Sequence, residues 1–304
     1  MLLKGLSFLV MKVKFPKKMS KILSNTKHLI FLFLFSFGSF SQSDSIVLNE
    51  IYKTSLTHGK TYEWLDFLSN QIGGRLSGSL NAERAVNWAE SELIKLGLDE
   101  VRLQPVMVPK WVRGNPEFAY VETKPGKTLN MNVCALGGSV STPPAGIKAK
   151  VVEVSSFDQL EALGRDKVEG KIVFYNRAMD KSIIDTFKSY GGCVDQRYDG
   201  AFHAAKLGAV AIIVRSMTLA IDDLPHTGSM SYGNLSVQQR IPAAAISTKD
   251  ADLLSSMLKM DNSIKFFLKQ NCKQLDDVLS YNVIGEIKGS DCLLYTSDAA
   301  DDEE

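Results

Sequence analysis

The sequence predicts an α/β fold in which a β/α domain interrupts a second domain. Through the middle of the chain, short apolar runs typical of strands alternate with amphipathic helical patterns. Helical patterns precede this part, and a new strand pattern over residues 280–287 follows it. We therefore expect a host domain that begins, is interrupted by an insert, and then resumes.

The composition is that of an ordinary globular protein. Of the 304 residues, 45% are hydrophobic and 23% are charged, and the formal net charge is +1. The charges are uneven, because residues 1–41 contain lysines and no acid, whereas residues 298–304 contain mainly Asp and Glu. The part between these ends is near neutral, so no nucleic-acid partner is expected.

The N-terminus has the pattern of an export signal. Lysines precede the apolar run 29–37, and small residues follow it. The run is too short to span a bilayer comfortably, although a membrane anchor is the alternative. We expect residues 1–41 to be a signal peptide and the mature protein to be exported (secreted, periplasmic or extracellular). No stable membrane span is expected after the signal is removed.

Two helices are expected at the start of the host domain, over residues 60–72 and about 80–96. Each repeats apolar side chains at the spacing of one helical face. The first face comprises Tyr62, Leu65, Leu68 and Ile72, and the second comprises Ala82, Ala85, Val86, Ala89, Leu93 and Leu96. The glycine-rich stretch 73–79 separates the helices. It is interpreted as a structural turn, because Ser79 stands where a phosphate-binding loop needs Lys.

A strand over residues 101–112 follows, and Pro105 and Pro109 indicate an edge strand or a bulged one. The β/α part then contains five apolar strand patterns. They cover residues 149–154, 170–175, 209–216, 241–247 and 263–270. Between them we expect a helix with a capping box formed by Ser156 and Gln159, a helix over residues 199–208, and a helix capped by Ser247 and Asp250. The polar stretch 273–277 is interpreted as a linker.

The search for catalytic motifs finds none. The chain has no G-x-S-x-G elbow and no H-E-x-x-H zinc helix, so no catalytic residue and no metal ligand is expected in it. Cys134, Cys193 and Cys272 are too widely spaced for a disulfide framework. Cys193 is interpreted as a buried thiol rather than a nucleophile, because no local feature indicates a lowered pKa.

Two histidines lie within the β/α part. His203 is expected to be half-buried on its helix among alanines. His226 lies in a loop bounded by Pro and Gly, where binding residues are often placed. Asp222 and Asp223 nearby leave a metal site as an alternative. We expect the loop Pro225, His226, Thr227 and Gly228 to form the rim of a substrate cleft in a neighbouring domain.

Several blocks in order resemble the N-terminal part of the family M28 metallopeptidases of the carboxypeptidase Q type. The resemblance covers roughly residues 60–290. The matching blocks are residues 73–79, 101–114, 135–160, 170–179, 190–197, 200–217, 224–232 and 241–248. It implies an α/β/α aminopeptidase-like catalytic domain, incomplete here, that is interrupted by a protease-associated insert.

The resemblance also implies a domain map. Residues 42–130 would begin the catalytic domain, with room for a short propeptide at their start. Residues 131–272 would be the insert, and residues 273–291 would resume the catalytic domain. Residues 292–304 are expected to be a sequencing-adapter artefact, because CLLYTSDAAD can be encoded by a transposase adapter used to prepare sequencing libraries.

The family's chemistry requires two zinc ions, held by His, Asp, Glu, Asp and His ligands, with a glutamate as general base. Their motifs are expected after the strand at 280–287, but no His follows His226. The resemblance therefore implies a dizinc exopeptidase acting on short peptides, of which this chain would be an inactive, zinc-free front part.

Two other functions remain open. A protease-associated domain could serve as a protein-binding module of another protease or a receptor. A doubly wound domain that binds a small molecule is the third alternative, and it lacks the expected glycine-rich turn. A second copy of the chain, forming a homodimer, is retained as a candidate partner.

Overall fold

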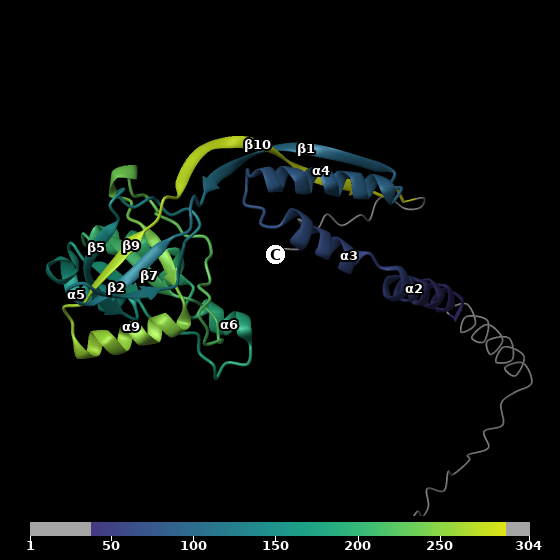
Figure 1. Cartoon of the computed structure of the whole chain (residues 1–304). Helices are drawn as coiled ribbons and strands as arrows, with labels where there is room; N and C mark the ends of the chain where they lie inside the picture. The colour runs from purple at the N-terminus through teal and green to yellow at the C-terminus, as the bar shows by residue number, and fades with distance from the viewer. Residues whose placement is uncertain (1–37, 290–304) are drawn as a thin grey trace, which may run out of the picture. The chain divides into compact units, whose positions relative to one another are not determined.

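The computed structural model describes residues 38–289 (Figure 1). The chain divides into two compact units, Met1–Gln71 and Ile72–Glu304, and each is described by itself. Most of the expected signal peptide and the whole expected artefact lie outside the described residues. No helix among the described residues has the length and apolar character needed to cross a membrane.

The described residues of the first unit, from residue 38 onward, are mainly helical. They include α2 (Gly38–His58), α3 (Thr61–Asp66) and most of the π-helical turn η1 (Phe67–Ile72). The helix predicted over residues 60–72 is therefore confirmed, with a change to π-helix at Phe67. Its predicted apolar face is largely unburied, since Tyr62 is 83% exposed and Leu65 is 58% exposed, and only Ile72 at its end is buried. A helical pattern specifies which side chains share a face, but burial also needs a partner layer.

The second unit begins with α4 (Leu80–Lys95), whose first turn is capped by the Ser79 hydroxyl accepting from the Ala82 amide at 3.2 Å. The turn before it is structural, as expected. Gly78 has φ 68°, and a Cβ there would lie 2.8 Å from Cγ2 of Val278. Only glycine fits this approach of the turn to strand β10. The predicted apolar stripe of α4 is at most half-buried along its length.

Strand β1 (Glu100–Val112) pairs antiparallel with β10 (Lys273–Glu286), from Glu100 opposite Glu286 to Val112 opposite Lys273. The register shifts between Val108 and Lys110, so of the two alternatives expected from Pro105 and Pro109 the strand has the bulge. The predicted linker over residues 273–277 is wrong, because these residues are the start of β10. Backbone pairing with β1 forms the strand, and its polar side chains are exposed.

Between these two paired strands, the chain forms an eight-stranded mixed sheet in the order β3-β2-β9-β5-β6-β7-β8-β4. Its strands are β2 (Phe118–Lys124), β3 (Lys127–Met131), β4 (Val133–Ala135), β5 (Ile147–Val154), β6 (Ile172–Tyr175), β7 (Ala211–Arg215), β8 (Ala243–Ile246) and β9 (Lys265–Lys269). Strands β5 to β8 are parallel to one another, and the outer pairs are antiparallel. The predicted α/β class and all five predicted strands are confirmed.

Helices cover both faces of this sheet (Figure 1). Those that pack on it are α5 (Phe157–Val168), α8 (Gly200–Lys206) and α9 (Thr248–Met260). The same part of the chain also contains α6 (Thr186–Gly191), α7 (Asp195–Tyr198) and the short turn η2 (Val237–Gln239). In β6, Ile172 and Phe174 pack in the cluster that contains Leu254 of α9. Val173 and Tyr175 pack in the opposite cluster with α5 and α8. Side chains alternate across a strand, so a strand covered on both faces is apolar throughout.

The helix caps largely follow the prediction. Ser156 accepts from the Gln159 amide, but the Gln159 side chain accepts from Ser155 instead of closing the box on Ser156. Ser247 accepts from the Asp250 amide. The Asp250 carboxylate accepts from the backbone and side-chain nitrogens of Asn132, at 2.6 and 2.8 Å. The cap of α9 is thereby bonded to the residue before β4.

Candidate functional site

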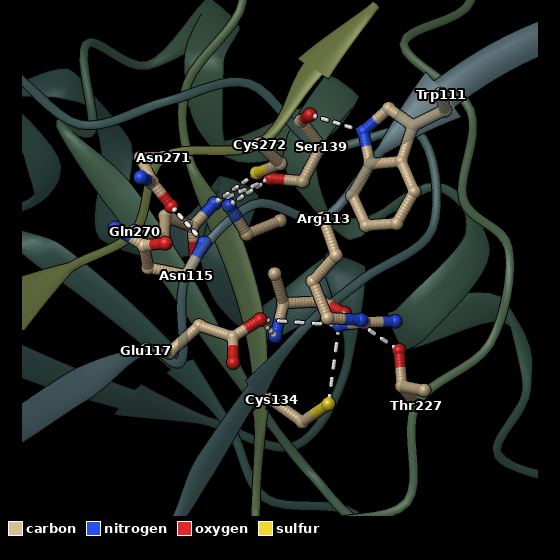
Figure 2. A network of polar contacts seen from close by, with 12 residues as sticks. Trp111, Arg113, Asn115, Glu117, Cys134, Ser139, Thr227, Gln270, Asn271 and Cys272 are labelled. Carbon is tan, nitrogen blue, oxygen red and sulfur yellow. Dashed lines mark hydrogen bonds and ion pairs between the residues drawn. The ribbon is translucent and has the colours of Figure 1, made fainter.

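The chain passes between the β1–β10 ladder and the eight-stranded sheet twice, at residues 113–117 and 270–272. A polar network holds both crossings (Figure 2). In the first, Nη1 of Arg113 donates to the Ala135 carbonyl at 2.6 Å and to Oε1 of Glu117 at 3.1 Å. The same Glu117 oxygen accepts from the Ala135 amide at 2.8 Å. Glu117 is nearly buried, so this crossing is fixed by charge-assisted bonds.

The second crossing is held through Gln270, which is buried. Its Nε2 donates to the Ser139 hydroxyl and to the Val140 carbonyl, both at 2.8 Å. Trp111 at the end of β1 donates to the Ser139 carbonyl, also at 2.8 Å (Figure 2). Residues 139–140 therefore receive bonds from both the ladder and the second crossing.

The predicted rim loop is attached to this network. The Thr227 hydroxyl donates to the Ala135 carbonyl at 2.7 Å, the same oxygen that Arg113 binds (Figure 2). The Gly228 carbonyl accepts from the Gly137 amide at 2.8 Å, and the His226 amide donates to the Ser216 hydroxyl at 2.8 Å. Backbone and hydroxyl bonds thus fix the loop, while the His226 imidazole is exposed.

A hollow of about 410 Å³ lies beside the loop, and its walls are mainly apolar. His226 forms part of the wall together with Phe187 and Tyr190. Met179 and Met217, which belong to a small buried cluster with Cys193, also contribute. The hollow is therefore suited to an apolar group of modest size.

Arg197 on α7 is not among the residues that line this hollow, but it contacts Tyr190, which does line it. Its guanidinium lies over the Tyr190 ring, with Cζ 5.5 Å from the ring centroid. It also passes over Gly228, where a Cβ atom would lie 2.5 Å from Nη1. The neighbouring carboxylate, Asp195, pairs with Arg177. Sequence analysis did not single out Arg197, because its contacts with Tyr190, seven positions before it, and with Gly228, about thirty positions after it, depend on the fold.

The other predicted candidates have structural surroundings. His203 is half-buried, as expected, and stacks on Phe157 with ring centroids 4.1 Å apart. Cys193 is buried, and burial raises the pKa of its thiol. Asp222 accepts from the Leu224 amide at 2.9 Å, and Asp223 pairs with Lys249 at 2.9 Å. Cys134, Cys193 and Cys272 are all free thiols.

The described residues do not fit a zinc pair. Within residues 38–289, no group of three or more His, Cys, Asp or Glu side chains is placed to hold a metal ion. A zinc site needs three or four such ligands around each ion. No catalytic step through zinc can therefore be assigned to this part of the chain.

Comparisons with known proteins indicate the class of protein that this chain resembles. No protein-family model matches the chain. Among solved structures, it is similar to a peptidase M28 precursor from Shewanella amazonensis, with a TM-score of 0.75 and 34% sequence identity. That match covers 82% of this chain and 55% of the other. The fold is therefore that of an M28 peptidase over the matched part.

Curated relatives then narrow the class. Bovine carboxypeptidase Q is 39% identical over 231 residues, which are 76% of this chain and 46% of the relative. Carboxypeptidase Q of Xenopus laevis is 39% identical over 237 residues, 77% and 48% of the two chains. The human protein is 36% identical over 231 residues, with 76% and 46% covered. The chain is a relative of the M28 peptidases of the carboxypeptidase Q type, and it spans about half the length of these relatives.

Proposed function

We propose that this chain is part of an exported exopeptidase that hydrolyses short peptides with a free C-terminus. The single observation that carries the proposal is the 39% identity to carboxypeptidase Q over 231 residues. The 0.75 TM-score to a peptidase M28 precursor supports the same function. Export is supported by the basic, apolar and small-residue pattern of residues 1–41.

The eight-stranded sheet is proposed to be the protease-associated insert of such an enzyme. Its position in the chain between the paired strands β1 and β10 supports an insertion. The insert was expected over residues 131–272. Because β2 and β3 pair within the same sheet, we propose that it begins at the first crossing, near residue 113. The ladder and α4 would then belong to the catalytic domain.

Two zinc ions are proposed to act in the parent enzyme, held by residues outside this sequence. The support is the half-length coverage of the relatives and the absence of any His after His226. Bound zinc would supply an activated water at neutral pH. The contribution proposed for this chain is to form the rim of the substrate cleft with Pro225, His226, Thr227 and Gly228. The 304-residue chain alone would be inactive.

The test compares the 304-residue chain with the product of the longer gene. Both are assayed for release of amino acids from a dipeptide series, with added zinc and then with a chelator. We expect chelator-sensitive hydrolysis from the longer protein and none from the chain. Hydrolysis by the chain itself, or an inactive longer protein that fails to bind zinc, would contradict the proposal.

A protein-binding module is the second candidate, and one observation favours it. The sheet has its own buried cluster on each face, so it has the core of an independent domain. A longer gene product without a cluster of metal ligands, but with a transmembrane helix or a different protease domain, would support this candidate. The homodimer remains a proposal that sedimentation of the longer protein would test.

A further inference from the structure

Arg197 carries a positive charge that the described part of the chain does not neutralise. No carboxylate among the described residues forms an ion pair with it. Asp195, which is two positions away in the chain, pairs with Arg177 instead. The Nε atom of Arg197 is buried and has no hydrogen-bond partner, as is also true of Nε in Arg177, Arg215 and Arg240, but Arg177 and Arg215 pair with carboxylates through their Nη atoms. Burying a guanidinium donor without a partner is costly, so such an atom needs an explanation.

The surrounding residues contact this guanidinium and restrict its position, but they do not form an ion pair with it. Tyr190 lies against its face, and Gly228 allows the rim loop to pass close to Nη1. Of the three guanidinium nitrogens, only Nε is both buried and without a hydrogen-bond partner. The two Nη atoms also have no partner among the described residues, but they are not buried, so a ligand can reach them. The nearby Cys193 thiol does not neutralise the charge, because burial raises its pKa. A fixed, unpaired guanidinium fork matches the geometry of a carboxylate.

The apolar hollow adjoins Arg197 through two shared neighbours. Tyr190 both supports the guanidinium and lines the hollow. The rim loop contacts Arg197 at Gly228 and contributes His226 to the wall of the hollow. A ligand bound here would therefore meet a positive charge and an apolar surface side by side.

We propose that Arg197 and the hollow form a subsite for a free carboxylate attached to an apolar side chain, as in the C-terminal residue of a short peptide. The subsite rests on the proposed function for its peptide ligand, and it assigns recognition of the carboxylate to Arg197. A phosphate group is a poorer match, because the other arginine nearby, Arg177, is paired with Asp195 and the adjoining walls are apolar.

The test measures binding to the full 304-residue chain, without any assay of hydrolysis. The probes are N-acetyl-leucine, its uncharged amide N-acetyl-leucinamide, and N-acetylglycine, which lacks the apolar side chain. Titrations are followed by nuclear magnetic resonance, with the shifts assigned to Arg197, Tyr190 and the rim loop. We expect the acid to bind about tenfold more tightly than the amide, because a charge-assisted bond is lost in the amide.

Two variants locate the binding. Arg197→Gln should remove the difference between acid and amide, whereas Arg165→Gln should leave it unchanged. Arg165 is the matched control, because its guanidinium is exposed and paired with Glu169 on the surface. Phe187→Ala should weaken N-acetyl-leucine about threefold and leave N-acetylglycine unchanged. Phe187 is 88% exposed, so this variant should fold.

Equal binding of acid and amide to the unaltered chain would overturn the proposal, whether or not Arg197→Gln folds. An unchanged acid–amide difference in a folded Arg197→Gln variant would also overturn it. An inactive parent enzyme would refute the proposed function and leave these binding results intact. Conversely, a parent enzyme that hydrolyses peptides while the chain shows no preference for the acid would refute only the subsite.

Discussion

The two sheets of the second unit differ in how completely their apolar surface is covered. In the eight-stranded sheet, every residue of β6, β7 and β8 is buried. In β1, β10 and α4, which the structure describes in full, no residue is buried. The ladder has the longer strands, yet strand length adds little stability without a layer against each face. The comparison indicates that the sheet supplies most of the unit's folding free energy.

Limited proteolysis should show the largest difference between the two regions. We expect early cuts in residues 45–112 and 273–289, leaving a resistant product that contains the eight-stranded sheet, roughly residues 113–272. Local opening is expected to be easier where few apolar groups are buried. Mass spectrometry of the products checks this outcome. Uniform resistance across residues 45–289 would show that the ladder is as stable as the sheet.

Truncation of one apolar side chain in each region should give the next largest effect. Phe266→Ala removes a fully buried ring from β9 and should cost about 3–5 kcal/mol of unfolding free energy. Met107→Ala in β1 is the control, since Met107 is 59% exposed, and it should cost less than about 0.5 kcal/mol. Urea unfolding followed by circular dichroism measures both. Equal costs would contradict the comparison.

The crossing between the regions should give an intermediate effect. Arg113→Gln removes the bonds to Ala135 and leaves the nearly buried Glu117 carboxylate without its cation, at a cost of about 1–3 kcal/mol. Arg102→Gln is the matched control within the ladder, because its partners Glu100 and Glu286 are exposed. That change should cost about 0–1 kcal/mol. Urea midpoints that shift equally in the two variants would argue against a fixed crossing.

Thiol reactivity should give the smallest and most local signal. Burial raises the pKa of Cys193 and Cys272, so at pH 8 less thiolate forms than in an unfolded chain. In a background in which Cys134 and Cys292 are replaced by Ser, we expect both thiols to react with a disulfide reagent at least tenfold more slowly than in urea. Reaction should accelerate as the pH rises toward the raised pKa values. Fast labelling at pH 8 in the folded chain would contradict their burial.

Sequence patterns predicted the sheet well because its central strands are apolar on both faces. The runs that contain β6 and β7 can be recognised without tertiary information. By contrast, the first residues of β10 are polar and exposed, and their strand conformation depends on pairing with β1. Local sequence carries no record of a partner about 160 residues away, so this segment was misread as a linker.

In the candidate site, too, sequence predicted what local residues specify and missed what depends on distant contacts. Pro and Gly around His226 predicted a loop, and the structure shows how Thr227 and Gly228 fix it. Arg197 was missed, because its significance depends on Tyr190, on Gly228 and on the engagement of Asp195 by Arg177. To decide which charged side chains are paired, one needs the distances between them. Sequence order alone cannot supply them.

The Ala135 carbonyl, which accepts from both Arg113 and Thr227, has a mechanical consequence. The His226 loop and the first crossing are therefore bonded to the same point of the sheet and would move with it as one body. Any change in the position of this loop relative to the ladder would have to arise on the ladder side of the network, without remodelling of the loop itself.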